Sequence, residues 1–335
     1  MTDHPAPDAT EQRHERRESI SALLHRLRLT PLSFAMATAT LVLLVVGLVW
    51  STHLVGSLRK DHVHWGLFVL AAGAASLQYL GFAIALRAAS DPHPPFGQTF
   101  ELEVAEAITT VVTPESIGSM ALSMRFLTRH GLSTPDAAAA AGLNSFVTTF
   151  VAAFFVPLGA IFASSSLNIA ALKKDVPSSQ WVIIVVILLV AAGVTLLIKL
   201  PRLRRDAAGW ARTMAGYLRT VITQPQRSLV MAAGEVVTAT GQVLCMALVL
   251  FAIGAPVHVA AILVVVQLAG AASNVVPIPG GLGAPEAILV AGLSSVGVSH
   301  DAAIIAALSY RIFMYWGPPI PGMFALWHLH RRDAI

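Results

Sequence analysis

Long apolar stretches without any Asp, Glu, Lys or Arg constrain the fold of this chain more than any other feature. Examples are residues 32–58, 65–86, 137–161 and 181–198. A helix needs about 20 apolar residues to cross a bilayer. Only 12% of the 335 residues are charged, roughly half the fraction of a soluble protein. The sequence therefore predicts an all-α, polytopic transmembrane bundle.

The charged residues predict how this bundle is oriented. Residues 1–30 are predicted to form a disordered cytosolic tail, because their polar N-terminal part has too few apolar side chains to fold alone. Residues 199–227 are rich in arginine and contain one acid, Asp206, so the positive-inside rule places this loop in the cytoplasm. Residues 31–332 then form a single integral membrane domain with seven or eight crossings and a cytoplasmic N-terminus.

Two apolar segments are interrupted by residues that break helices. The first runs from Glu101 to Arg129 and contains Thr113-Pro114-Glu115-Ser116-Ile117-Gly118. The second contains Pro277-Ile278-Pro279-Gly280-Gly281-Leu282-Gly283-Ala284-Pro285-Glu286. Proline and glycine in mid-segment indicate a broken or re-entrant element, and the sequence leaves open whether each one spans the membrane or folds back.

The two interrupted segments also resemble each other. Val111-Val112, Pro114 and Ile117-Gly118 recur as Val275-Val276, Pro279 and Leu282-Gly283, at an offset of 164 to 165 positions. Further on, Gly131-Leu132-Ser133 corresponds to Gly297-Val298-Ser299. The pattern predicts an internal repeat with halves at about 100–163 and 265–329. Repeated halves with discontinuous helices are typical of transporters, whose substrate site lies between the halves.

The second interruption is a candidate phosphate site. Its residues Pro279, Gly280, Gly281 and Gly283 leave backbone amides accessible, and a helix that starts near Ala284-Pro285-Glu286 points its positive N-terminus toward the gap. The alternative is a plain interhelical turn, because proline and glycine occur in loops generally.

Arg311 lies inside an otherwise uncharged apolar stretch, where a charge needs a partner or an aqueous cavity. It either holds an anionic head group through bidentate contacts or forms a structural ion pair with Glu286 or Glu235. Glu235 and Asn274 are further substrate-binding candidates, although interhelical hydrogen bonds are the commoner use of such residues. Arg125 is a weaker candidate, because an arginine at this position is more often an interfacial anchor than a ligand, and Glu101, Glu103 and Glu106 are interpreted as a solvated helix start.

The sequence carries no catalytic signature. None of the four lysines follows a glycine, so the chain has no nucleotide-binding phosphate loop, and zinc, hydrolase and cysteine–histidine motifs are absent as well. We therefore expect no metal, no cofactor and no ATP hydrolysis by this chain alone. The basic residues flank apolar stretches, which favours anionic membrane lipid over nucleic acid as the partner. The oligomeric state has no signal in the sequence.

The motif V-P-x-P-G-G-L-G-x-x-E at 276–286, the G-x-S-x-x-x-A turn at 297–303 and the single arginine that follows resemble the transmembrane region of lysylphosphatidylglycerol synthases, also called the flippase-like domain family. The likeness extends over about 30–332 and is specific in 274–320. It implies a protein of the bacterial inner membrane that moves a lipid between leaflets, with matching positions at Pro277, Pro279, Gly280, Gly281, Gly283, Glu286 and Arg311. We expect no soluble synthase domain and no synthase activity.

The first half departs from the family pattern. Family members usually have a Gly-Glu pair and a nearby arginine at the first interruption, and an arginine and aspartate in the next helix. Here Gly118 precedes Ser119, and Asn144-Ser145-Phe146 occupies the next helix. Our leading hypothesis is a translocase for an anionic phospholipid or a lipid-linked head group. The alternatives are a membrane enzyme that acts on polyprenyl-phosphate or lipid-linked sugars with Glu286 or Glu235 as base, and a scaffold for an envelope-synthesis enzyme.

Overall fold

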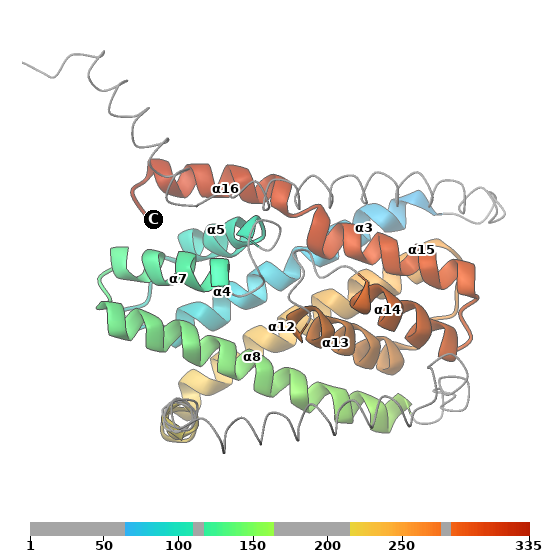
Figure 1. The fold of residues 1–335 in the computed structure, drawn as a ribbon, viewed down its shortest axis with the longest axis horizontal. Coiled ribbons are helices and arrows are strands. Elements are labelled where there is room, and N and C mark those ends of the chain that lie inside the picture. The colour runs from blue at the N-terminus through green and yellow to red at the C-terminus, as the bar shows by residue number, and fades with distance from the viewer. Residues whose placement is uncertain (1–63, 110–116, 164–214, 276–282) are drawn as a thin grey trace, which may run out of the picture.

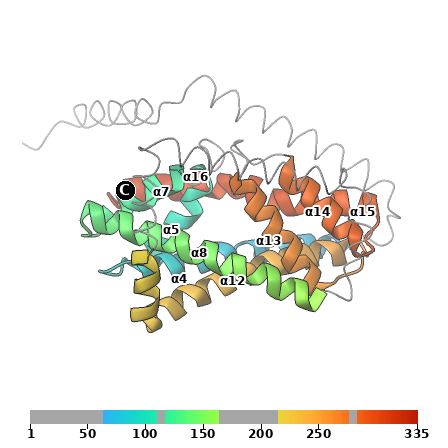
Figure 2. The ribbon, with the colours of Figure 1, turned by 60° about the horizontal axis from the view of Figure 1, so that its bottom comes forward.

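The computed structural model describes residues 64–109, 117–163, 215–275 and 283–335, and its elements are all helical, with no strand in these ranges. The predicted all-α class is therefore confirmed. Helix α16 (Pro319–Arg331) runs along the upper edge of the bundle in Figure 1 and α8 (Thr134–Ala163) along the lower edge, and in the turned view of Figure 2 α8 crosses the front of the molecule. The predicted tail, the first helix at 32–58, the span at 181–198 and the arginine-rich residues 199–214 lie outside the described ranges.

Three stretches of helix are long and apolar enough to cross a bilayer. They are Trp65–Ala89, Thr134–Gly159 and Pro225–Ala252. The first comprises α3 (Trp65–Ala75) and α4 (Leu77–Ala89), the second lies in α8, and the third is α12. Large apolar side chains on α8 point outward, with Phe150 61% and Phe154 59% exposed. A lipid environment explains an exposed apolar face that would be unfavourable in water.

Helices α4 and α12 pack at very short range because glycines face each other. A Cβ atom added to Gly81 would lie 2.4 Å from the carbonyl oxygen of Gly234. Small residues allow this close approach, which supplies dispersion contacts where lipid removes the hydrophobic drive for helix association. The α4–α12 pair therefore forms a rigid centre against which the other elements pack.

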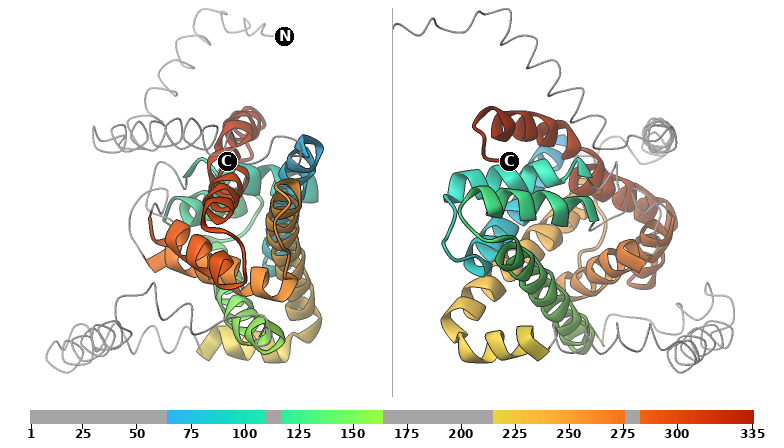
Figure 3. Two further views of the ribbon diagram at one scale, coloured as in Figure 1. Left: turned by 90° about the vertical axis from the view of Figure 1, so that its right-hand side faces the viewer. Right: turned by 60° about the vertical axis from the view of Figure 1, so that its left-hand side comes forward.

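The first interrupted segment folds back as a helical hairpin. It comprises α5 (Phe96–Glu106) and α7 (Ile117–Arg129), which lie side by side (Figures 1 and 3). At the open end His130 Nε2 lies 2.7 Å from Gln98 Oε1, and near the closed end Ser123 Oγ donates to Glu106 Oε1. With 11 and 13 residues, neither helix is long enough to span alone. The segment is therefore a hairpin of two short helices, and its re-entry into the membrane stays a prediction.

The second interrupted segment has the same form. Helices α13 (Val259–Val275) and α14 (Ala284–Ser295) pack together, and a Cβ atom on Gly292 would lie 2.5 Å from Val265 Cγ2. Val265 lies well before the interruption and Gly292 well after it, so the chain must turn back between them. Helix α14 begins at Ala284, as predicted.

The turns that follow the two hairpins match bond for bond. Gly131 and Gly297, 166 positions apart, have φ of +96° and +90°, a region that favours glycine. Leu132 donates to the carbonyl of Leu127, and Val298 donates to that of Leu293, both at 3.2 Å. The paired geometries agree with the predicted repeat, although Gly254 and Ala255 end α12 in the same way. The number of crossings and the boundaries of the two halves stay predictions.

The last helical run is interrupted where the sequence places its prolines. Helix α15 (His300–Arg311) passes into a π-helical turn, η3 (Ile312–Trp316), and α16 begins at Pro319. The Gly317 amide reaches the Ile312 carbonyl at 2.7 Å, which widens the helix by one residue. Such π-turns occur frequently at functional sites.

Candidate functional site

Arg311 is buried at the junction of α15 and η3. Its side chain is 1% exposed, although arginine is usually solvated. The guanidinium carbon lies 4.1 Å from the centroid of the Tyr315 ring and 5.5 Å from that of Trp316. Both rings belong to the π-turn, so the local widening of the helix presents aromatic faces to the cation.

Glu286 holds the charge of Arg311 and the start of α14 at the same time. Its Oε1 lies 2.7 Å from Arg311 Nε, and its Oε2 accepts a hydrogen bond of 2.7 Å from the Gly283 amide. Gly283 precedes the first residue of α14 and has a φ of +102°, so glycine suits the position. One carboxylate thus neutralises a buried cation and satisfies an otherwise unpaired amide at a helix N-terminus.

This geometry decides between the two partners proposed for Arg311. The ion pair is with Glu286 and not with Glu235, which accepts from Thr148 instead. The guanidinium and the helix N-terminus, both expected to attract an anion, are engaged by the same carboxylate. An anionic ligand must displace or share this carboxylate to reach them. Pro277, Pro279, Gly280 and Gly281 lie outside the described residues, so their predicted role stays a prediction.

A second group of ionisable side chains lies on the first hairpin and on α12. It consists of Glu103 and Glu106 on α5 and Glu235 on α12, and we call it the carboxyl cluster. Glu103 is 7% exposed and Glu235 5%, and Glu103 lies within electrostatic reach of the other two. Interpreting these α5 acids as a solvated helix start was therefore wrong for Glu103. Tertiary packing of α5 against α4 and α16 buries a residue whose type favours solvent.

Among the described residues, the side chains that donate hydrogen bonds to the carboxyl cluster are hydroxyl groups. Ser123 on α7 donates to Glu106, and Thr148 on α8 donates to Glu235 Oε1 at 2.6 Å. Among the described residues no arginine or lysine forms an ion pair with these acids. A buried carboxyl without a cation is stable when protonated or when a ligand brings hydrogen-bond donors or positive charge.

Helix α4 connects the carboxyl cluster with the Arg311 site. Gln78 Nε2 donates to the Met314 carbonyl in the π-turn at 3.2 Å. The next residue, Tyr79, lies within electrostatic reach of both Tyr315 and Glu103. Polar side chains of the first hairpin and of the π-turn therefore lie near the same stretch of α4. The cavity that we expected between the halves stays a prediction.

The remaining predicted site residues do not join this group. Arg125 lies on an exposed part of α7, which fits an interfacial anchor. Asn274 belongs to α13, but its side chain lies outside the described set. Sequence reasoning missed Glu103, Ser123 and Thr148. One signal was present for the acids, because Glu103 and Glu106 are three residues apart and so share a helix face.

The apolar spans, the two helical hairpins and the buried ionisable groups define a helical integral membrane protein. The chain matches the family described as the lysylphosphatidylglycerol synthase TM region over residues 16–322, and it belongs to that family. A comparison with curated proteins found no match.

Proposed function

We propose that this protein translocates a phospholipid or a lipid-linked head group across the bacterial inner membrane, with its N-terminus in the cytoplasm. The observation that carries the proposal is the burial of ionisable groups from both repeat halves next to α4. Ionisable residues inside membrane proteins are costly and most often mark a transport pathway. Membership in a lipid-related membrane family supports the same function.

The Glu286–Arg311 pair suggests how a phosphate could be bound without leaving the buried Arg311 unpaired. When no substrate is bound, Glu286 satisfies Arg311 and the Gly283 amide. An arriving phosphate offers more acceptor oxygens and can take over these donors as Glu286 turns aside. The exchange replaces one anion by another, so the buried guanidinium keeps a counter-charge throughout.

The carboxyl cluster complements this site by accepting hydrogen bonds from a head group. Amine or hydroxyl groups are donors, and buried carboxyl oxygens are acceptors for them. The acyl chains would remain in the bilayer while the head group crosses. Because the sequence has no nucleotide-binding motif, the energy would come from a gradient or from unequal lipid populations in the two leaflets.

A scrambling assay in proteoliposomes tests this function. Vesicles carry fluorescently labelled phosphatidylglycerol, and dithionite quenches the label only in the outer leaflet. The double variant Glu286→Gln with Arg311→Gln removes both charges while keeping amide hydrogen-bonding groups. We expect the protein-dependent rate to fall by at least tenfold. The matched control is Arg129→Gln, which removes an exposed arginine on α7 and should scramble like the wild type.

Equal scrambling by the folded double variant and the wild type would contradict the proposed site. The same preparation separates the other two hypotheses. Turnover of a lipid-linked donor by the pure protein would favour a membrane enzyme, and co-purification of an envelope-synthesis enzyme without any scrambling would favour a scaffold.

A further inference from the structure

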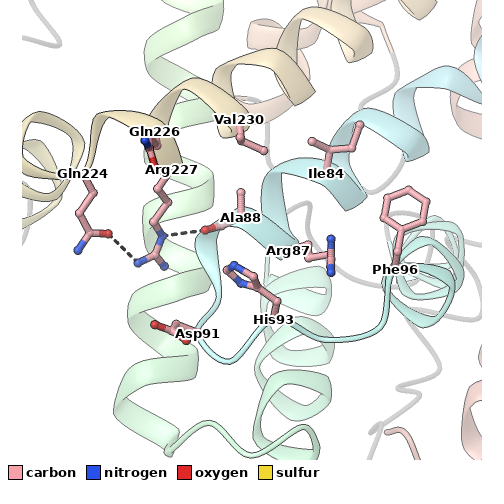
Figure 4. A pocket seen from close by; sticks show the side chains of 10 residues that line it. All are labelled: Ile84, Arg87, Ala88, Asp91, His93, Phe96, Gln224, Gln226, Arg227 and Val230. Carbon is pink, nitrogen blue, oxygen red and sulfur yellow. Dashed lines mark hydrogen bonds between the residues drawn. The ribbon is translucent and has the colours of Figure 1, made fainter.

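A hollow of about 470 Å³ lies where α4 ends and α12 begins (Figure 4). Arg87 and His93 line it from the α4 side, and Gln226, Arg227 and Val230 line it from α12. We call it the Arg87–Arg227 hollow. It is remote in sequence from the Glu286–Arg311 pair and takes no part in the proposed translocation.

Backbone carbonyl groups hold both arginines in place. Arg227 Nε donates to the Ala88 carbonyl at 2.7 Å, and Nη2 donates to that of Ala89, so the guanidinium caps the negative C-terminal end of α4. Arg87 Nε donates to the Pro94 carbonyl at 3.0 Å. Because these bonds already fix the two side chains, a ligand that binds them causes little further loss of side-chain entropy.

The charges of the two arginines are not neutralised by carboxylates. Within the described ranges neither Arg87 nor Arg227 forms an ion pair, although Asp91 also lines the hollow. Two guanidinium groups against one carboxylate give the hollow a positive balance. Arg227 also donates from Nη1 to Gln224 Oε1 at 3.0 Å, whereas the two terminal nitrogens of Arg87 have no hydrogen-bond partner among the described residues. A planar guanidinium with such N–H groups is well suited to phosphate oxygens.

The position of the hollow favours a lipid over a free anion. It lies at the ends of two adjacent candidate spans, Trp65–Ala89 and Pro225–Ala252. The ends of a membrane span lie at the bilayer surface, where the phosphates of lipids are located. An exposed apolar stripe on α12 begins beside it with Leu229, 70% exposed, and continues at intervals of seven or eight residues through Val236, Leu244 and Phe251. A lipid with its phosphate in the hollow can lay an acyl chain along this stripe.

We propose that the Arg87–Arg227 hollow binds the phosphate of an anionic glycerophospholipid, in the leaflet that contacts the N-terminus of α12. Phosphatidylglycerol represents this class. Val230 lines the hollow and is 48% exposed, which makes it the link between the charged pocket and the lipid-facing stripe. The bound lipid stays at the interface between the protein and the bilayer and need not be the molecule that is translocated.

Native mass spectrometry of the full-length protein, delipidated in detergent, tests the site. Phosphatidylglycerol and phosphatidylcholine with identical acyl chains are titrated separately, and inorganic phosphate is added as a competitor in a third series. The wild type should bind phosphatidylglycerol more tightly than phosphatidylcholine, and millimolar phosphate should compete weakly. Arg87→Gln should weaken phosphatidylglycerol binding about tenfold, which corresponds to one lost charge-assisted contact.

Two further variants keep the result interpretable. Gln226→Glu adds a negative charge from the α12 side at an exposed position and should also lower the preference for phosphatidylglycerol. Arg332→Gln removes an exposed arginine after α16 and should leave it unchanged. Equal affinity for the two lipids, or an unchanged preference in Arg87→Gln, would overturn the proposal. Complete displacement of phosphatidylglycerol by inorganic phosphate would contradict the proposal that the ligand is a lipid and would indicate a site for free anions.

Discussion

Replacing Glu286 by glutamine leaves Arg311 as a buried cation without its counter-charge. The two side chains are 18% and 1% exposed and their bonded atoms lie 2.7 Å apart, so little water is present to compensate. Two charges about 4 Å apart attract each other by about 4 kcal/mol at an effective dielectric constant of 20. Breaking such a buried pair typically costs about 3–5 kcal/mol, because one charge stays behind unpaired.

The variants form a double-mutant cycle. Glu286→Gln should lower the free energy of unfolding by about 3 kcal/mol, since the amide oxygen can still accept from the Gly283 amide. Arg311→Gln should cost less, because Glu286 keeps that bond and some access to water. The double variant should cost less than the sum of the two by about 2 kcal/mol, because neither charge then remains unpaired.

Unfolding in mixed micelles of mild detergent and dodecyl sulfate measures these differences. Tryptophan fluorescence is a suitable signal, since Trp316 lies 5.5 Å from the Arg311 guanidinium. The matched control is Glu101→Gln, which breaks a bond of 2.9 Å to His328 between partners that are 29% and 40% exposed. A pair this exposed contributes about 0–1 kcal/mol. The reasoning would be refuted if the changes in the free energy of unfolding from the substitutions at 286 and 311 were strictly additive. A Glu286→Gln variant as stable as the wild type would refute it too.

Other substitutions test the helix packing, the repeated turn and the carboxyl cluster by thermal unfolding in detergent. Gly81→Ala places a Cβ atom 2.4 Å from the Gly234 carbonyl oxygen and should cost about 1–3 kcal/mol, whereas Gly73→Ala meets nothing within 4 Å and should be neutral; equal effects would contradict the close packing of α4 and α12. Gly297→Ala forces alanine to a φ of +90° and should cost about 1–2 kcal/mol. Glu103→Gln should leave stability unchanged or raise it, because the uncharged amide is easier to bury, while lipid scrambling falls; a marked loss of stability would indicate that Glu103 has a cationic partner.

The positions at which the chain interrupts its helices could be predicted from the sequence. Proline and glycine act locally, so the break after α13, the start of α14 at Ala284 and the bend before Pro319 follow from the residues at those positions. The apolar spans follow from bilayer thickness, which sets the length of a crossing independently of packing. The similarity of the two turns could also be predicted, because each depends on a glycine and its immediate neighbours.

The direction of the chain at each interruption could not be predicted in this way. A helix broken by proline can continue across the membrane or fold back, and the choice depends on contacts between its two parts. Gln98 and His130 are 32 positions apart, and their hydrogen bond closes the open end of the first hairpin. Local sequence patterns contain no term for a contact at that separation.

The amino-acid sequence by itself determined that this protein is a helical membrane protein and where proline and glycine interrupt its helices, because those properties depend on local conformation and on solvation by lipid. The tertiary structure alone decided that Glu103 is buried, that Glu286 and not Glu235 neutralises Arg311, and that Arg87 and Arg227 line one hollow. The physical reason is that burial and charge pairing depend on which distant segments pack together. A carboxylate is the same residue type in either setting, and its neighbours determine whether it is solvated, paired or buried.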